Sequence, residues 1–244
     1  FFKGLCLIQT QRWQELDILL NNSIHSHQDL FAKILPALKL KKMGHSAQAL
    51  QLIHSLSLLQ LQKNISPIVL AEIYLQLGSV YFANSEFLMA MELYQQAYEH
   101  FAKISWIGKK AISAFNCFVA CDNLKQSIEA DQWLLETETL LKNHSLVPLE
   151  NSVLVSQIEK MVFAGQLTSA IKNYENIHSK NLLSRLNPRQ NILIHQAIAT
   201  AYMELGYLNL AENSLRVARE NIFQFQHLDL EIFQMALELN FESI

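Results

Sequence analysis

The stretch that decides the fold runs from Ala71 to Ile104 and reads AEIYLQLGSVYFANSEFLMAMELYQQAYEHFAKI. Apolar residues recur in it at intervals of three and four, the spacing that places side chains on one face of an α-helix. The pattern is interrupted near Ser85 by a short polar segment. The stretch therefore predicts two helices joined by a turn.

The same pattern recurs along the chain every 40 or 41 residues, and its most regular feature is an alanine at positions Ala49, Ala90, Ala130, Ala170 and Ala211. Four residues after each alanine stands a large apolar side chain, at Ile53, Tyr94, Leu134, Tyr174 and Leu215. Five residues before each alanine stands a residue of the turn, at Gly44, Ser85, Lys125, Gly165 and Gly206. Small side chains let two antiparallel helices pack closely, and stacked pairs share one core. The period predicts about five stacked helix pairs.

Prolines and the unusual repeat length refine this prediction. Pro67, Pro148 and Pro188 lie just before new repeats, where they end one helix and can begin the next. Pro36 falls inside an expected first helix, which it either kinks or begins. The segment from Glu86 to about Ile107 has no helix breaker before Gly108, so we expect the extra residues of the long period to lengthen the helices.

We predict an all-α fold and one helical-repeat domain spanning residues 1–244. A partial unit covers 1–29, full units cover about 30–63, 71–104, 111–144, 151–184 and 192–225, and a terminal helix covers 228–244. The chain opens at Phe1 inside an amphipathic pattern, without an initiator methionine, so we expect it to be part of a longer protein.

The best unit resembles the tetratricopeptide repeat (TPR) family through Tyr74, Leu77, Gly78, Tyr81, Phe87, Ala90, Tyr94 and Ala97. The unit at 192–225 resembles it through Ala199, Tyr202, Gly206, Leu208, Ala211, Leu215 and Ala218. The resemblance implies a right-handed superhelical solenoid of antiparallel helix pairs that binds proteins. The family's usual period is shorter, and longer units are similar to those of kinesin light chains and of bacterial transcription regulators with helical-repeat sensor domains.

Composition agrees with helices and excludes several classes of function. Half of the 244 residues are hydrophobic, with only six glycines and four prolines, and 19 basic and 22 acidic residues are interspersed. We therefore expect no nucleic-acid contact, and no apolar run approaches the ~18 residues of a membrane span. The three cysteines are few and odd in number, which argues against a disulfide scaffold. They favour a reducing, cytoplasmic setting.

Catalytic and metal-binding motifs are missing from the sequence. Gly108 and Lys109 lack the upstream glycine and the following Ser or Thr of a phosphate-binding loop. We predict no enzyme activity, no cofactor and no metal site. Cys117 and Cys121 share a helix face and are interpreted as core residues rather than metal ligands. His25 and His27 are interpreted as a solvated loop, with metal binding as the alternative.

The resemblance implies that the first helix of each pair lines a concave binding face. Carried over by register, that face consists of Leu75, Gln76, Ser79, Phe82, Phe115, Asn116, Val119, Val155, Ser156, Glu159, Gln196, Thr200 and Met203. For the apolar members of this set two interpretations are open: they face the groove, or they pack against the next repeat.

No Lys or Arg occurs in this set, unlike the carboxylate-clamping members of the family that hold acidic chaperone tails. A neutral groove predicts a partner that is an amphipathic helix or a partly hydrophobic peptide, bound with weak salt dependence. Self-association through an uncapped repeat is a further possibility. The leading hypothesis is a protein- or peptide-binding scaffold. The alternatives are a ligand- or peptide-sensing segment of a larger bacterial-type transcription or signalling regulator, and a helical accessory domain of an enzyme.

Overall fold

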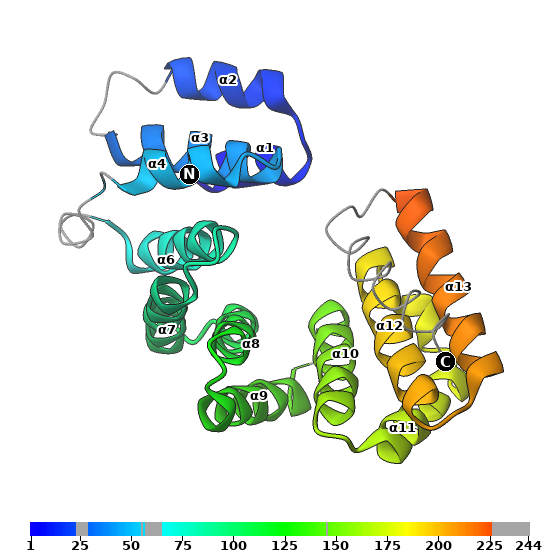
Figure 1. Cartoon of the computed structure of the whole chain (residues 1–244). Coiled ribbons are helices and arrows are strands. Elements are labelled where there is room, and N and C mark those ends of the chain that lie inside the picture. The colour runs from blue at the N-terminus through cyan, green and yellow to red at the C-terminus, as the bar shows by residue number, and fades with distance from the viewer. Residues whose placement is uncertain (23–28, 55, 57–64, 145, 226–244) are drawn as a thin grey trace. The chain divides into compact units, whose positions relative to one another are not determined.

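The computed structural model describes residues 1–22, 29–54, 56, 65–144 and 146–225. Over these residues the chain forms twelve α-helices, one short 3₁₀-helix and no strand (Figure 1). The predicted all-α class is confirmed. The expected terminal helix at 228–244 and the His25–His27 segment lie outside the described residues.

The helices follow one another as antiparallel pairs. They are α1 (Phe2–Gln9) with α2 (Trp13–Asn22), α3 (Asp29–Lys42) with α4 (Ser46–His54), α6 (Pro67–Phe82) with α7 (Phe87–Lys103), α8 (Ile107–Asn123) with α9 (Ser127–Lys142), α10 (Val147–Phe163) with α11 (Leu167–Ser179), and α12 (Pro188–Glu204) with α13 (Leu208–Phe225). The 3₁₀-helix, Leu183–Arg185, precedes α12.

The last four pairs each begin four residues before the predicted start of their unit. Pro67, Pro148 and Pro188 explain three of these starts, because each lies in the first turn of its helix instead of in the preceding connection. A proline is favoured there, since its fixed φ suits a helix and its missing N–H needs no partner. At α12 the start is reinforced by Asn187, which accepts a hydrogen bond from the Gln190 N–H at 2.9 Å.

The predicted end of one helix is wrong, and one of the two alternatives for Pro36 is excluded. α7 ends at Lys103, short of Ile107, because Ser105 adopts a left-handed φ of 56° that closes the helix before the next one begins. Helices are nevertheless long in both positions of a pair, with 17 residues in each of α8, α10 and α12, 17 in α7 and 18 in α13. Pro36 lies inside α3, so it does not mark the start of that helix.

The turn inside each full pair has the same backbone geometry. The residue five positions before the buried alanine has a positive φ in every case, at Gly44 (85°), Ser85 (62°), Lys125 (60°), Gly165 (71°) and Gly206 (78°). A left-handed residue after a helix lets the last carbonyls accept hydrogen bonds and turns the chain back on itself. The predicted turn positions are confirmed, including the two that do not carry glycine.

The predicted alanine ladder lies in the core of the structure. Ala49, Ala90, Ala130, Ala170 and Ala211 are all fully buried. Gly78 is equally constrained, because a Cβ on this residue would lie 2.7 Å from the ring of Tyr94 on the partner helix. Because the backbones of the two paired helices lie close together, these positions accept only small side chains.

The chain divides into two compact units, residues 1–144 and 145–244. In the first unit α3 packs against α1, α4 and α6, and the later helices pack in sequence from α6 to α9. In the second unit α12 packs against α10, α11 and α13. Each unit has its own core, built around residues such as Ile73 and Phe101 in the first and Ile158, Ile194 and Ile198 in the second.

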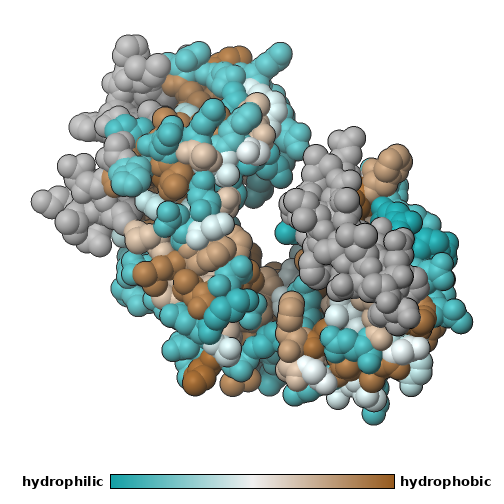
Figure 2. Space-filling model, viewed as in Figure 1, coloured by the Kyte–Doolittle hydropathy of each residue, from teal (hydrophilic) through white to brown (hydrophobic). Residues whose placement is uncertain are grey.

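Hydrophobic and hydrophilic side chains alternate over the visible surface of each unit, and in the first unit apolar side chains gather over α6 and α7 (Figure 2). No helix among the described residues is both long and apolar enough to cross a bilayer.

Candidate binding surface on the first helices

The structure divides the thirteen predicted groove residues by exposure. Nine of them are partly exposed: Gln76, Ser79, Phe82, Phe115, Asn116 and Val119 in the first unit, and Ser156, Glu159 and Thr200 in the second. The other four, Leu75, Val155, Gln196 and Met203, are at most 9% exposed. For these four the groove assignment needs correction, because buried side chains stabilise the packing of the helices and offer little surface to a partner.

In the first unit a buried carboxylate ties α6 to α8. Glu72 is 2% exposed and accepts hydrogen bonds from Gln76 Nε2 at 2.8 Å and from Lys109 Nζ at 3.0 Å. The second oxygen of Glu72 lies 2.9 Å from the same Lys109 nitrogen. A buried charge is tolerated only when it is paired and hydrogen-bonded in this way. Gln76 is thus held by Glu72 on its own helix, and Glu72 is in turn held by Lys109 of α8.

A second cation reaches the predicted groove from α3. Lys41 Nζ donates a hydrogen bond of 2.7 Å to Ser79 Oγ, and the Ser79 hydroxyl donates in turn to the Gln76 carbonyl oxygen at 2.6 Å. The expectation of a groove without lysines is therefore wrong for the first unit. Lys41 stands one 41-residue period before Phe82, so extending the register to the preceding repeat would have found it.

These side chains border a pocket of about 180 Å³. It lies between the first helices of three successive pairs and is lined by Leu5, Ile8 and Gln9 of α1, Leu38, Lys41 and Lys42 of α3, and Gln76 of α6. The pocket combines an apolar wall with two amines and two amides. Ligand sites have this character when a few polar groups fix the orientation of a mostly apolar ligand.

Two aromatic members of the predicted face pack against neighbours within the same unit. The ring of Phe82 lies 5.2 Å from that of Phe87, and the ring of Phe115 lies 5.5 Å from that of Phe118. Both phenylalanines keep part of their surface exposed. Asn116, on the same helix as Phe115, is also partly exposed, so α8 presents mixed polar and apolar surface.

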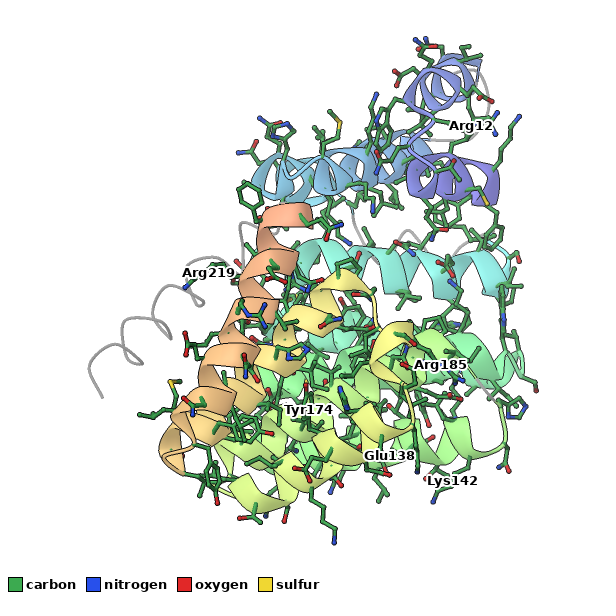
Figure 3. The ribbon with its side chains drawn as sticks, turned by 90° about the vertical axis from the view of Figure 1, so that its right-hand side faces the viewer. Arg12, Glu138, Lys142, Tyr174, Arg185 and Arg219 are labelled. Atoms are coloured by element: carbon green, nitrogen blue, oxygen red, sulfur yellow. The ribbon has the colours of Figure 1, made fainter. Side chains whose placement is uncertain are left out.

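In the second unit His195, whose pKa is strongly lowered, precedes Gln196 of the predicted binding face. His195 of α12 is buried, its ring lies 5.7 Å from that of Tyr174, and its Nδ1 is 3.5 Å from the Tyr174 hydroxyl. Figure 3 draws Tyr174 among the helices of this unit. Burial, with a smaller contribution from His178, lowers the pKa of His195 from 6.5 to about 4. The neutral imidazole therefore belongs to the folded core.

The cysteine pair is part of the core, as predicted. Cys117 and Cys121 are both fully buried, and Cys121 Sγ lies 3.4 Å from Met91 Sδ. Burial raises the pKa of both thiols, which makes them poor nucleophiles and poor metal ligands. Within the described part of the chain no group of three or more His, Cys, Asp or Glu side chains is placed to hold a metal ion.

Comparisons with known proteins identify the fold. No protein-family model matches the chain, and no curated protein matches its sequence. Solved structures do match, and two of them are described as having TPR-like repeats. A Podosopora anserina protein assigned as a kinesin light chain, with nearly identical TPR-like repeats, is 17% identical with a TM-score of 0.59. That match covers 83% of this chain and 100% of the other.

Two further structures agree. A single-residue variant of the same Podosopora anserina protein is 18% identical with a TM-score of 0.61, covering 83% of this chain and 99% of the other. BtubC (BKLC) from P. vanneervenii is 16% identical with a TM-score of 0.61, covering 92% of this chain and 90% of the other. The chain therefore has a TPR-like repeat fold, as the sequence predicted.

Proposed function

We propose that this chain is a non-catalytic scaffold that binds a protein or peptide on the exposed surface of its first helices. The observation that carries the proposal is the pocket between α1, α3 and α6, which is lined by the predicted groove residue Gln76 and by Lys41, the hydrogen-bond donor to Ser79. Stacked helix pairs share a core while leaving the residues between packing positions available for contacts. The partner that best fits this mixed surface is an amphipathic helix or a partly hydrophobic peptide.

The fixed polar groups of the first unit support this proposal. Gln76 is held by Glu72 and Ser79 by Lys41, so little side-chain freedom is lost when a partner binds. The odd and sparse cysteine set favours a cytoplasmic setting for such a scaffold.

A selection of displayed peptides on the purified chain, followed by affinity measurements, tests the proposal. Asn116→Arg adds a long charged side chain to the proposed surface. We expect it to lower the affinity for the selected peptides by about tenfold or more. Gln96→Arg is the matched control, because Gln96 is exposed on the second helix α7. We expect this control to leave affinity unchanged.

A further variant, Ser79→Arg, probes the same surface from α6. Circular dichroism and thermal unfolding establish that each variant is folded before its affinity is compared. Full retention of peptide affinity in both folded groove variants would show that partners bind elsewhere.

A second function is supported by the size of the pocket. A volume of about 180 Å³ suits a small molecule as well as a side chain of a peptide. This favours, as the alternative proposal, a sensing segment of a larger bacterial-type transcription or signalling regulator. Saturable binding of a small molecule that also alters peptide affinity would support it, whereas peptide binding without any small-molecule effect would argue for the scaffold alone.

A further inference from the structure

The lining of the pocket in the first unit combines two kinds of side chain. Leu5, Ile8 and Leu38 are apolar, whereas Lys41 and Lys42 carry amines and Gln9 and Gln76 carry amides. A molecule that fills the pocket must therefore offer both an apolar part and an acceptor for these donors.

Unlike Lys39 and Lys109, Lys41 has no carboxylate partner among the described residues. Lys39, two positions earlier, contacts Asp17 Oδ1 at 2.7 Å, and Lys109 is paired with Glu72. The amine of Lys41 instead contacts the neutral hydroxyl of Ser79. Burial, and to a smaller extent the charge of Lys42, lowers the pKa of Lys41 from 10.5 to about 8. A partly buried ammonium next to another cation is stabilised by any anion that enters the pocket.

The size of the pocket limits what that anion can be. A cavity of about 150 Å³ holds one benzene-sized molecule, so a pocket of about 180 Å³ accepts a compact group of similar size. A run of several acidic residues does not fit into it, and a bare inorganic anion would leave the leucine and isoleucine side chains without contacts.

We propose that this pocket binds a carboxylate carried on a short, branched aliphatic group. The carboxylate would accept hydrogen bonds from Lys41 and Lys42, and the aliphatic part would lie against Leu5, Ile8 and Leu38. The inference rests on the proposed function, because the same surface would hold the partner. Two sources supply this chemistry: a free short-chain acid, and the C-terminal residue of a peptide that ends in an aliphatic side chain.

The first test uses 3-methylbutanoate and its uncharged, nearly isosteric amide as probes. Binding to the whole chain is followed by NMR of lysine labelled with ¹³C at Cε. We expect the acid to shift the Lys41 signal saturably, and the amide to bind at least about tenfold more weakly, because charge-assisted hydrogen bonds are lost. Equal binding of the acid and the amide, or no shift of the Lys41 signal, would overturn the inference.

Matched lysine variants locate the site. Lys41→Gln should weaken 3-methylbutanoate binding about tenfold or more, whereas Lys39→Gln, two residues away and paired with Asp17, should leave it unchanged. Lys42→Gln, at an exposed position lining the same pocket, should weaken binding several-fold and provides the test if Lys41→Gln does not fold. Unchanged affinity in folded Lys41→Gln and Lys42→Gln would exclude this pocket.

Raising the pH adds an independent readout. Leu5, Ile8 and Gln9 of α1, and Gln76 and Ser79 of α6, carry no charge, so Lys41 and Lys42 are the charged groups that the described residues place at the pocket. Because an anion favours the protonated amine, affinity for 3-methylbutanoate should fall as the pH rises through about 8. Affinity that is constant from pH 6 to pH 9.5 would contradict the role of Lys41.

The two sources are separated with a peptide, acetyl-Ala-Ala-Ala-Leu, carrying either a free or an amidated C-terminus. Tighter binding of the free-acid peptide than of 3-methylbutanoate identifies a peptide C-terminus as the ligand. Binding of 3-methylbutanoate but not of the peptide identifies a free acid.

The outcome also separates this inference from the proposed function. Asn116→Arg on α8 should weaken the selected peptides but not 3-methylbutanoate, since Asn116 does not line the pocket. Loss of the acid site with intact peptide selection defeats only the inference. Acid binding in a chain whose selected peptides ignore Asn116→Arg and Ser79→Arg defeats only the scaffold proposal.

Discussion

At the residue scale, the turns show how one backbone geometry accepts different side chains. Glycine occupies the left-handed position in three of the five full pairs, whereas Ser85 and Lys125 occupy it in the other two. A residue with a Cβ pays a steric cost at positive φ that glycine avoids. The Ser85 and Lys125 turns therefore carry strain that the rest of each pair outweighs.

We predict that Lys125→Gly stabilises the first unit by about 0.5–1 kcal/mol, because glycine relieves the strained φ of 60° at an exposed position. Urea unfolding followed by tryptophan fluorescence measures the change, since Trp13, Trp106 and Trp133 all lie in residues 1–144. The converse control, Gly44→Ala, should lower the free energy of unfolding, because its φ is 85° and no neighbour lies near the added Cβ. Destabilisation by Lys125→Gly would contradict this account.

His195 gives the second residue-scale prediction. Its folded-state pKa of about 4 lies below its ordinary 6.5, so the neutral form favours folding. This contribution is complete above about pH 6.5 and is lost as the pH falls towards 4, amounting to about 2 kcal/mol of lost stability at pH 5. Amide hydrogen exchange resolved to α12, at pH 5 and pH 7, measures it.

The matched comparison for this prediction uses two glutamine variants. His195→Gln should show a much smaller loss of α12 protection between pH 7 and pH 5, whereas His144→Gln, at an exposed position in the first unit, should behave like the unchanged chain. The same pH dependence in both variants would mean that another group titrates.

At the element scale, the distance between paired helices is set by small residues. Gly78 of α6 faces Tyr94 of α7, which stands four residues after the buried Ala90. We predict that Gly78→Ala destabilises the first unit by about 1–3 kcal/mol, because its Cβ would lie 2.7 Å from the Tyr94 ring and 3.2 Å from the Ala90 carbonyl oxygen.

Tryptophan fluorescence during urea unfolding again provides the measurement. Ile68→Ala, at the exposed start of α6, is the control and should cost much less. Equal effects of the two substitutions would show that helix spacing at Gly78 is not the controlling factor.

At the scale of the whole molecule, the two units hold separate cores. The cluster around Ile73 and Phe101 lies within residues 1–144, and the clusters around Ile158 and Ile192 lie within residues 145–244. We predict that the fragment 1–144 folds by itself, because in repeat proteins stability comes from each repeat and its nearest neighbours. Its far-ultraviolet circular dichroism should be helical.

The quantitative form of this prediction uses the position of the tryptophans. All three lie in the first unit, so fluorescence-detected unfolding of the fragment and of the full chain should give nearly the same midpoint. A fragment that is unfolded, or whose midpoint is far lower, would show that residues 145–244 are needed for the fold of 1–144.

The sequence by itself determined the helix pairs, because local spacing dictates them. The buried ladder from Ala49 to Ala211, and the turn positions from Gly44 to Gly206, lie where the period placed them. The end of α7 could not be derived in this way, because a left-handed residue such as Ser105 leaves no clear pattern in the sequence.

Only the tertiary structure decided which side chains meet at the candidate surface. Gln196 and Val155 have the register of groove residues and are nevertheless buried, since burial depends on neighbouring helices far away in the sequence. Lys41 and Ser79 are 38 residues apart, and the stacking of α3 on α6 brings them within hydrogen-bonding distance. A repeat pattern specifies which face of each helix packs, whereas the lengths of long side chains and the spacing between helices specify what that face can bind.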